Sequence, residues 1–373
     1  MLNSRLLGSY REQKIGVWRK RMARKIIEIQ HHLSSGCCMC SGIEDLYATR
    51  TNQSIPEGFL LALGSFGETI FIKMNNSEKP YMFSANDARP KTVYENLKDE
   101  LGLEYKITGG TTVEYAKKSI KKEIDAGYPV VLGPLDMFYL PYLKMYHTEH
   151  IPIHYVLMIG YEEEKNCVLI YDCDREDMIE LAVSDLELAW NIEKNGVGDK
   201  NGFIKIRLGE NLPDKYILSC NCLVRKAERQ LREKPYILGI SAYEKIAREL
   251  PKWKKKFSEE EYRKALISIT EYMGKVPKIP NQIMGIKETD IPYHANYDRL
   301  ANIIHELGQE YKQDNWIKSA NLFDKCGKNI ETIVTYIVQY CCNDVDRIDE
   351  LPNLFLENAD YAKEAYQLIQ NTK

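Results

Sequence analysis

The stretch HYVLMIGYEEEKNCVLIYD, residues 154–172, decides the fold class because two apolar runs flank one polar turn. Residues 154–161 and 167–172 each have the length of a strand, so we predict an antiparallel hairpin. With the turn centred near residue 164, position 172 lies opposite 156 and position 154 lies opposite 174. These positions share one parity, which predicts that His154 and Asp172 project from the same face as diagonal neighbours.

The segments around this hairpin alternate between helix-like and strand-like patterns. Helices before strands are typical of an α+β fold. We expect helices at 43–49, 56–64, 91–101, 112–126 and 183–190, and strands at 69–74, 81–84, 129–132 and 202–208.

Two further regions flank this α+β domain, which we place at residues 30–225. Residues 1–29 carry eight Lys and Arg against two Glu, and they predict a basic arm that is helical from 15 to 29. The basic face of this arm is either simply solvated or a docking site for an acidic partner. Residues 226–373 repeat apolar side chains at helical spacing and predict an all-helical domain.

The overall composition narrows the classes of function. The chain has 373 residues, with 51 Lys and Arg against 54 Asp and Glu, and this balance gives no indication of nucleic-acid binding. The apolar runs are far shorter than a membrane helix, and the first residues lack the apolar core of a signal peptide. We therefore expect a cytoplasmic protein with free thiols.

The segment SSGCCMCSG, residues 34–42, is a small turn that delivers Cys37, Cys38 and Cys40 to the start of a helix. The positive end of a helix dipole favours a thiolate, which is the nucleophilic form of cysteine. His154 is then a suitable base, and Asp172 could hold its tautomer. The spacing alone leaves open that the histidine is structural.

A zinc site is the alternative interpretation of the cysteines. Cys37 and Cys40 form a C-x-x-C pair, and Cys220 and Cys222 could supply two more ligands. The second pair is separated by one residue and falls in a predicted strand. We therefore predict no metal.

Several segments together resemble proteins of the butirosin biosynthesis protein H family. Residues 36–43 resemble the family's Gly-x-His-Cys-x-Ser opening motif, and residues 154–161 resemble its His-x-Val-x-x-x-Gly-Tyr strand. The likeness spans roughly residues 30–225, and the helical remainder is similar to a domain that often follows in this family. The other matching segments are residues 125–130, Asp136 with 140–142, and 171–172.

The resemblance implies a papain-like cysteine-protease fold used to form amides in antibiotic biosynthesis. It implies Cys38 as the nucleophile, His154 as the base and Asp172 as its orienting residue. The chain departs from the motif at Cys37, where the family has His, and at Cys40, where it has Ser, so both remain alternative nucleophiles. The chain is also similar in kind to a papain-like enzyme of polythioamide (closthioamide) assembly, which couples carrier-bound acyl chains to a diamine.

The same resemblance implies the rest of the site. His32 lies six residues before Cys38, the spacing of the oxyanion donor in papain-like enzymes, and Gln30 is the second choice. Asp136 and Tyr142 would bind substrate on the acceptor side, unless Asp136 only caps a turn. The implied partners are an acyl or peptidyl carrier protein as donor and a small amine as acceptor. The only implied prosthetic group is the carrier's 4′-phosphopantetheine.

Two other functions fit the same residues. A cysteine hydrolase, either a peptidase or a thioesterase, would use the triad with water in place of the amine. A non-catalytic module that binds a carrier protein or a metal would retain these residues as a relict. The presence of all three triad residues favours an enzyme.

Overall fold

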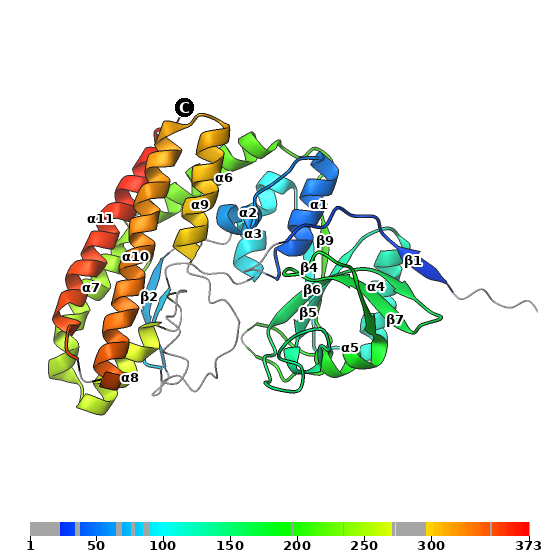
Figure 1. Ribbon diagram of the computed structural model, residues 1–373, viewed down its shortest axis with the longest axis horizontal. Coiled ribbons are helices and arrows are strands. Elements are labelled where there is room, and N and C mark those ends of the chain that lie inside the picture. The colour runs from blue at the N-terminus through cyan, green and yellow to red at the C-terminus, as the bar shows by residue number, and fades with distance from the viewer. Residues whose placement is uncertain are drawn as a thin grey trace, which may run out of the picture.

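The computed structural model describes residues 23–33, 38–64, 69–75, 79–84, 90–195, 197–233, 235–270, 273, 296–343 and 345–372. A large sheet with its covering helices lies at one end of the molecule and a helical bundle lies at the other, with α1, α2 and α3 between them (Figure 1). The architecture is α+β with a C-terminal helical region, as the sequence predicts.

The large sheet has seven strands, and every pairing in it is antiparallel. Its order is β4-β9-β5-β6-β7-β8, and β1 pairs with β6 just beyond the end of β5. The strands are β1 (Arg24–Ile26), β4 (Glu104–Thr108), β5 (Val130–Leu135), β6 (His154–Glu162), β7 (Cys167–Tyr171), β8 (Ile179–Ala182) and β9 (Phe203–Arg207).

The β6–β7 hairpin confirms the pairing predicted for residues 154–172. At the end away from the turn the register is the predicted one, with Leu157 opposite Tyr171. A bulge between Met158 and Gly160 shifts the pairing by one residue nearer the turn. The bulge therefore keeps His154, the first residue of β6, and Asp172, which follows β7, on the same side of the hairpin.

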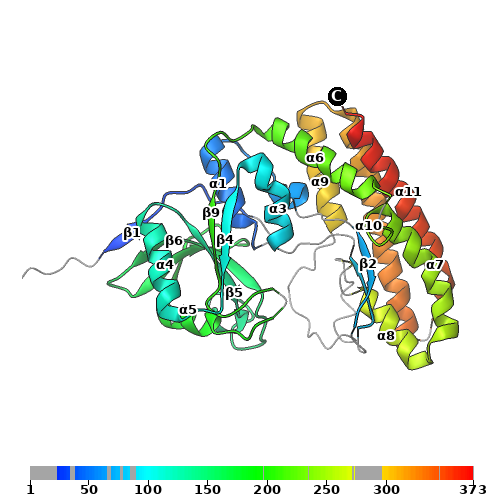
Figure 2. The same cartoon turned by 180° about the vertical axis from the view of Figure 1, so that it is seen from behind.

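Helices cover both faces of the sheet (Figures 1 and 2). Helix α1 (Ser41–Thr51) packs on one face, while α4 (Val113–Asp125) and α5 (Val183–Trp190) cover the other. Close packing of α1 depends on Gly42, since a Cβ at this position would lie 2.8 Å from the Leu157 side chain. The first turn of α1 is thereby fixed against the centre of the sheet.

The remaining helices form the bundle and its connection to the sheet. In Figure 2, α6 runs from the sheet side towards α11 and α7. The described residues also include the 3-10 helices η1 (Met137–Tyr139), which contacts α5, and η3 (Ile348–Glu350). The helices are α2 (Phe59–Gly64), α3 (Pro90–Leu101), α6 (Lys215–Leu231), α7 (Ile240–Lys256), α8 (Glu259–Thr270), α9 (Asn296–Glu310), α10 (Asp314–Asn343) and α11 (Leu351–Gln370).

The predicted domain boundary differs from the structure. Position 225 falls inside α6, which already packs against α11, so the chain leaves the sheet at the end of β9. The hairpin of β2 (Ile70–Lys73) and β3 (Tyr81–Ser84) also packs against the bundle, where Phe83 contacts the rings of Tyr243 and Phe355. Local patterning gives the strands correctly but not the distant helices that bury them.

The predicted N-terminal helix is also corrected. Residues 1–22 lie outside the described residues, but Arg24–Ile26 form strand β1 instead of the end of a helix. Strand β6 extends beyond β5, so an edge of β6 would have unpaired backbone groups there. Strand β1 pairs with these groups. As to the bilayer, no helix in the described part of the chain has the length and apolar character to span one.

Candidate active site

Cys38 lies in the turn that leads into α1. The turn covers residues 38–40, and the Cys40 carbonyl accepts hydrogen bonds from the first amides of the helix, those of Ile43 and Glu44. Cys38 is partly exposed, whereas Cys40 is fully buried. Residues 34–37, which include the alternative nucleophile Cys37, lie outside the described residues.

His154 and Asp172 meet at the end of the β6–β7 hairpin. Nε2 of His154 lies 2.7 Å from Oδ2 of Asp172, which confirms the predicted neighbourhood of these side chains. The imidazole also shares a hydrogen bond with Cys38. Since Nε2 is directed to the carboxylate, Nδ1 is the nitrogen left for the thiol. The structure thus brings Cys38, His154 and Asp172 into one chain of contacts.

Two further groups hold the Asp172 carboxylate, whose side chain is fully buried. Oδ1 accepts a hydrogen bond of 2.7 Å from the Cys173 amide, and Oδ2 accepts one of 2.8 Å from the Tyr142 hydroxyl. Every oxygen of the carboxylate therefore has a donor, as a buried charge requires.

Charge within this cluster favours an imidazolium next to a carboxylate. Burial disfavours the charged ring of His154, but the Asp172 charge and hydrogen bonds to Asp172 and Cys38 raise the pKa of His154 well above its ordinary value. Burial likewise disfavours the Asp172 anion, yet the pKa of Asp172 is lowered by the charge and hydrogen bond of His154 and by its other donors. His154 is therefore held in its protonated, imidazolium form.

Residues 37–173 match the sequence model of the family described as butirosin biosynthesis protein H, N-terminal. This segment is similar to that family. The matched segment contains Cys38, His154 and Asp172 and ends one residue after Asp172. No curated protein matches the chain.

Two residues expected to bind substrate in this domain have other contacts. The Tyr142 hydroxyl is used by Asp172, and burial together with that carboxylate raises the pKa of Tyr142 well above its ordinary value, so it stays a donor. Asp136 is buried and accepts hydrogen bonds from the amides of Phe138 and Ile151 and lies 2.6 Å from Nδ1 of His150. The acceptor-side roles stay predictions: the structure shows Tyr142 donating to Asp172, and Asp136 capping η1 as the alternative interpretation expects.

The predicted oxyanion donor is also directed elsewhere. Nδ1 of His32 lies 2.8 Å from Asp45 and Nε2 lies 3.4 Å from Glu44, as ion pairs rather than aligned hydrogen bonds. Despite burial, these carboxylates raise the pKa of His32 to about 10. The second choice, Gln30, is exposed and makes its hydrogen bond through its backbone amide, to Thr49. Neither contact set supports an oxyanion role.

His31 is a site residue that the sequence analysis missed. Its Nδ1 lies 2.7 Å from Asp45 of α1, and its ring stacks on Tyr171 with centroids 4.2 Å apart. Its Nε2 reaches the carbonyls of Arg175 and Asp172 at 2.8 Å and 3.2 Å. The only sequence signal is a His-His pair ahead of the acidic pair on α1, and nothing in that pattern distinguishes it from a surface turn.

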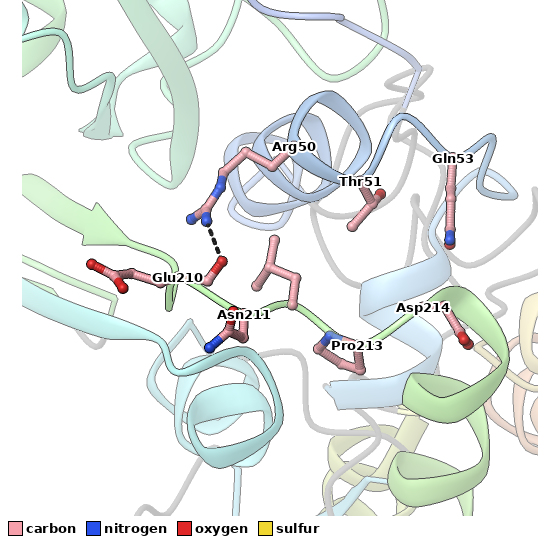
Figure 3. A pocket seen from close by; sticks show the side chains of 8 residues that line it. Arg50, Thr51, Gln53, Glu210, Asn211, Pro213 and Asp214 are labelled. Atoms are coloured by element: carbon pink, nitrogen blue, oxygen red, sulfur yellow. Dashed lines mark hydrogen bonds between the residues drawn. The ribbon is translucent and has the colours of Figure 1, made fainter.

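The described residues give no support for the zinc alternative. Cys220 and Cys222 lie on helix α6 and not on a strand, and no group of His, Cys, Asp and Glu suited to a metal ion occurs in the described ranges. A polar cavity of about 370 Å³ lies at the opposite end of α1 from Cys38 (Figure 3). There Arg50 donates to the carbonyl oxygens of Leu208 and Glu210 and so ties α1 to the segment leading to α6.

Proposed function

We propose that the protein is a cysteine acyltransferase that forms an amide in antibiotic biosynthesis, with a carrier-protein thioester as donor and a small amine as acceptor. The observation that carries the proposal is the contact chain from Cys38 through His154 to Asp172, inside a segment similar to the butirosin biosynthesis protein H family. A helix that starts just after the cysteine and packs on a sheet that supplies the histidine is the arrangement expected of a papain-like fold.

The first half-reaction acylates Cys38. The thiolate attacks the thioester carbonyl, a new carbon–sulfur bond forms, and the oxyanion is stabilised by the Cys38 amide. Collapse breaks the bond to the pantetheine sulfur, which takes the proton of the His154 imidazolium. The raised pKa of His154 suits this step, because the proton is already in place before the donor arrives.

The second half-reaction transfers the acyl group to the amine. The amine nitrogen attacks the acyl carbon, and neutral His154 removes the excess proton from nitrogen. The carbon–sulfur bond to Cys38 then breaks, which releases the amide and restores the thiolate beside an imidazolium. Thioester exchange is nearly isoenergetic and amide formation is downhill, so no nucleotide is consumed. A diamine acceptor, as in polythioamide assembly, stays a prediction.

The test is intact-protein mass spectrometry with an acyl-loaded carrier protein in the absence of amine. We expect a mass increase equal to the acyl group on the native chain and none on Cys38→Ala, with Cys40→Ala as the matched control that keeps the adduct. An adduct that survives in Cys38→Ala and disappears in Cys37→Ala would move the nucleophile to Cys37.

A hydrolase with the same triad is the alternative, and product analysis separates the two. The acylated protein is mixed with a panel of primary amines and diamines, and amide and free acid are quantified. Amide formation that rises with amine concentration at the expense of free acid supports the transferase. Free acid alone, at a rate that no amine in the panel changes, would assign hydrolysis.

A further inference from the structure

His31 makes contacts that the proposed chemistry does not use. Its side chain is only 4% exposed, and both ring nitrogens lie within hydrogen-bond distance of oxygen atoms. The partners are a carboxylate and two main-chain carbonyls, all of which accept. Both nitrogens must therefore donate, which makes the ring an imidazolium.

The two ends of this ring connect different parts of the site. On one side Asp45 belongs to α1, the helix that begins three residues after Cys38. On the other side the carbonyls of Asp172 and Arg175 belong to the turn that presents the carboxylate to His154. The stack on Tyr171, with ring planes 11° apart, fixes the orientation of the ring between them.

We propose that His31 is a positioning residue, which as an imidazolium clamps the turn of Asp172 to α1 and so holds the imidazole of His154 in line with Cys38. This inference rests on the proposed role of Cys38. The charge of His31 is balanced by Asp45, and the neighbouring His32 contacts both Asp45 and Glu44 of the same helix. The Arg175 guanidinium is directed away, to the Tyr142 carbonyl.

His32 supplies a matched control, because it contacts the same Asp45 carboxylate at 2.8 Å. His31→Gln and His32→Gln each remove one positive charge from this cluster, but the contacts to the triad turn belong to His31. A role that is only structural, or only electrostatic, predicts similar effects of the two substitutions. A positioning role predicts a lower reactivity of the Cys38 thiol in His31→Gln and little change in His32→Gln.

The readout is the rate at which iodoacetamide alkylates Cys38 at pH 6, measured by peptide mass spectrometry. At this pH a thiolate paired with an imidazolium reacts, whereas an ordinary thiol does not. We expect about a tenfold lower rate in His31→Gln and a change below about twofold in His32→Gln. Equal losses in both variants, or a native rate in His31→Gln, would overturn the proposal.

A double substitution shows whether His31 acts through Asp172. In an Asp172→Asn background, His31→Gln should change the alkylation rate by less than about twofold, because the group it positions is already altered. Multiplicative losses would place its effect elsewhere and overturn the proposal.

A second variant keeps the proposal testable if His31→Gln gives no cooperative thermal transition. Tyr171→Leu removes the stack that orients the ring and leaves the buried charges in place, and we expect about a threefold lower rate. A native rate in Tyr171→Leu would then overturn the proposal. If Cys38 forms the acyl adduct but these variants are alkylated at the native rate, only this inference fails. If Cys38 forms no acyl adduct, the proposed function fails and this inference fails with it.

Discussion

Two histidine–aspartate pairs lie close together in the chain and have almost the same contact distance. Nε2 of His154 lies 2.7 Å from Asp172, and Nδ1 of His150 lies 2.6 Å from Asp136. The side chain of His154 is 10% exposed and that of His150 is 60% exposed. The distances therefore do not distinguish a catalytic pair from a structural one.

The surroundings of the two pairs differ in what each ring meets on its other side. The His154 ring shares a hydrogen bond with the Cys38 thiol, whereas the His150 ring stacks on Phe138, with centroids 4.0 Å apart. Oδ1 of Asp136 accepts hydrogen bonds from two backbone amides and so fixes the loop that contains η1. A third reactive partner and burial mark a candidate triad, and a carboxylate occupied with amides marks a cap.

The largest expected effect is the loss of His154. His154→Ala should lower the rate of Cys38 acylation by about 10⁴-fold, because the ring supplies the proton to the leaving thiol. His150→Ala removes an equally short contact and should stay within about twofold. Single-turnover acylation by an N-acetylcysteamine thioester, followed by mass spectrometry, measures both. Comparable losses in the two variants would end the distinction between the pairs.

The next effect concerns the two carboxylates. Asp172→Asn should lower the acylation rate by about 10²-fold and leave a measurable remainder, because Asp172 orients and stabilises the imidazolium without reacting. Asp136→Ala should instead lower the melting temperature and leave the rate per folded molecule near native, since it loses the cap of η1. Thermal unfolding and single-turnover kinetics on the same samples separate these results.

The sequence predicts the His154–Asp172 neighbourhood because it depends on local information. A polar turn between two apolar runs sets the register, and the register sets which side chains meet. The fates of Asp136, Tyr142 and His32 depend on loops and helices that pack from elsewhere in the chain. Their true partners lie up to 30 residues away, as for Tyr142 and Asp172, and no periodic pattern encodes such a contact.

The same limit applies to the fold. Individual strands and helices are predictable from their periods and caps, as at Thr112, whose hydroxyl accepts from the Tyr115 amide at the start of α4. The packing of the β2–β3 hairpin on the helical bundle is not predictable in this way. It depends on contacts between aromatic residues that are distant in sequence, such as Tyr81 and Trp253. Strand β1 exists because β6 extends past β5, a fact of the assembled sheet.

A smaller effect is expected from the hydroxyl that shares Oδ2 of Asp172 with His154. Tyr142→Phe should lower the acylation rate by about tenfold, the size of one hydrogen bond to a charged group. Tyr139→Phe is the control, since this ring packs near His150 and belongs to the structural pair. A native rate in Tyr142→Phe would show that His154 and the Cys173 amide hold Asp172 without help.

The smallest expected effect concerns the basic N-terminal arm predicted from the sequence. Arg24 lies in β1 and pairs with Glu162 at 3.4 Å, so reversing its charge would disturb the sheet edge. Arg19→Glu with Lys20→Glu tests docking without touching that contact, although both positions lie outside the described residues.

Acyl carrier proteins are generally acidic, and charges at the rim of an interface mainly steer association. The double reversal should therefore slow acylation by the carrier-bound donor about threefold at low salt and weaken its dependence on salt, because screening then has less attraction to remove. Acylation by the N-acetylcysteamine thioester should not change, since this small donor lacks the carrier's surface.

The control is Lys255→Glu with Lys363→Glu, which makes an equal charge change on exposed helical positions of the bundle. It should leave both rates near native. Equal slowing of the two donors by the arm reversal would assign the arm to stability of the fold and remove it from docking.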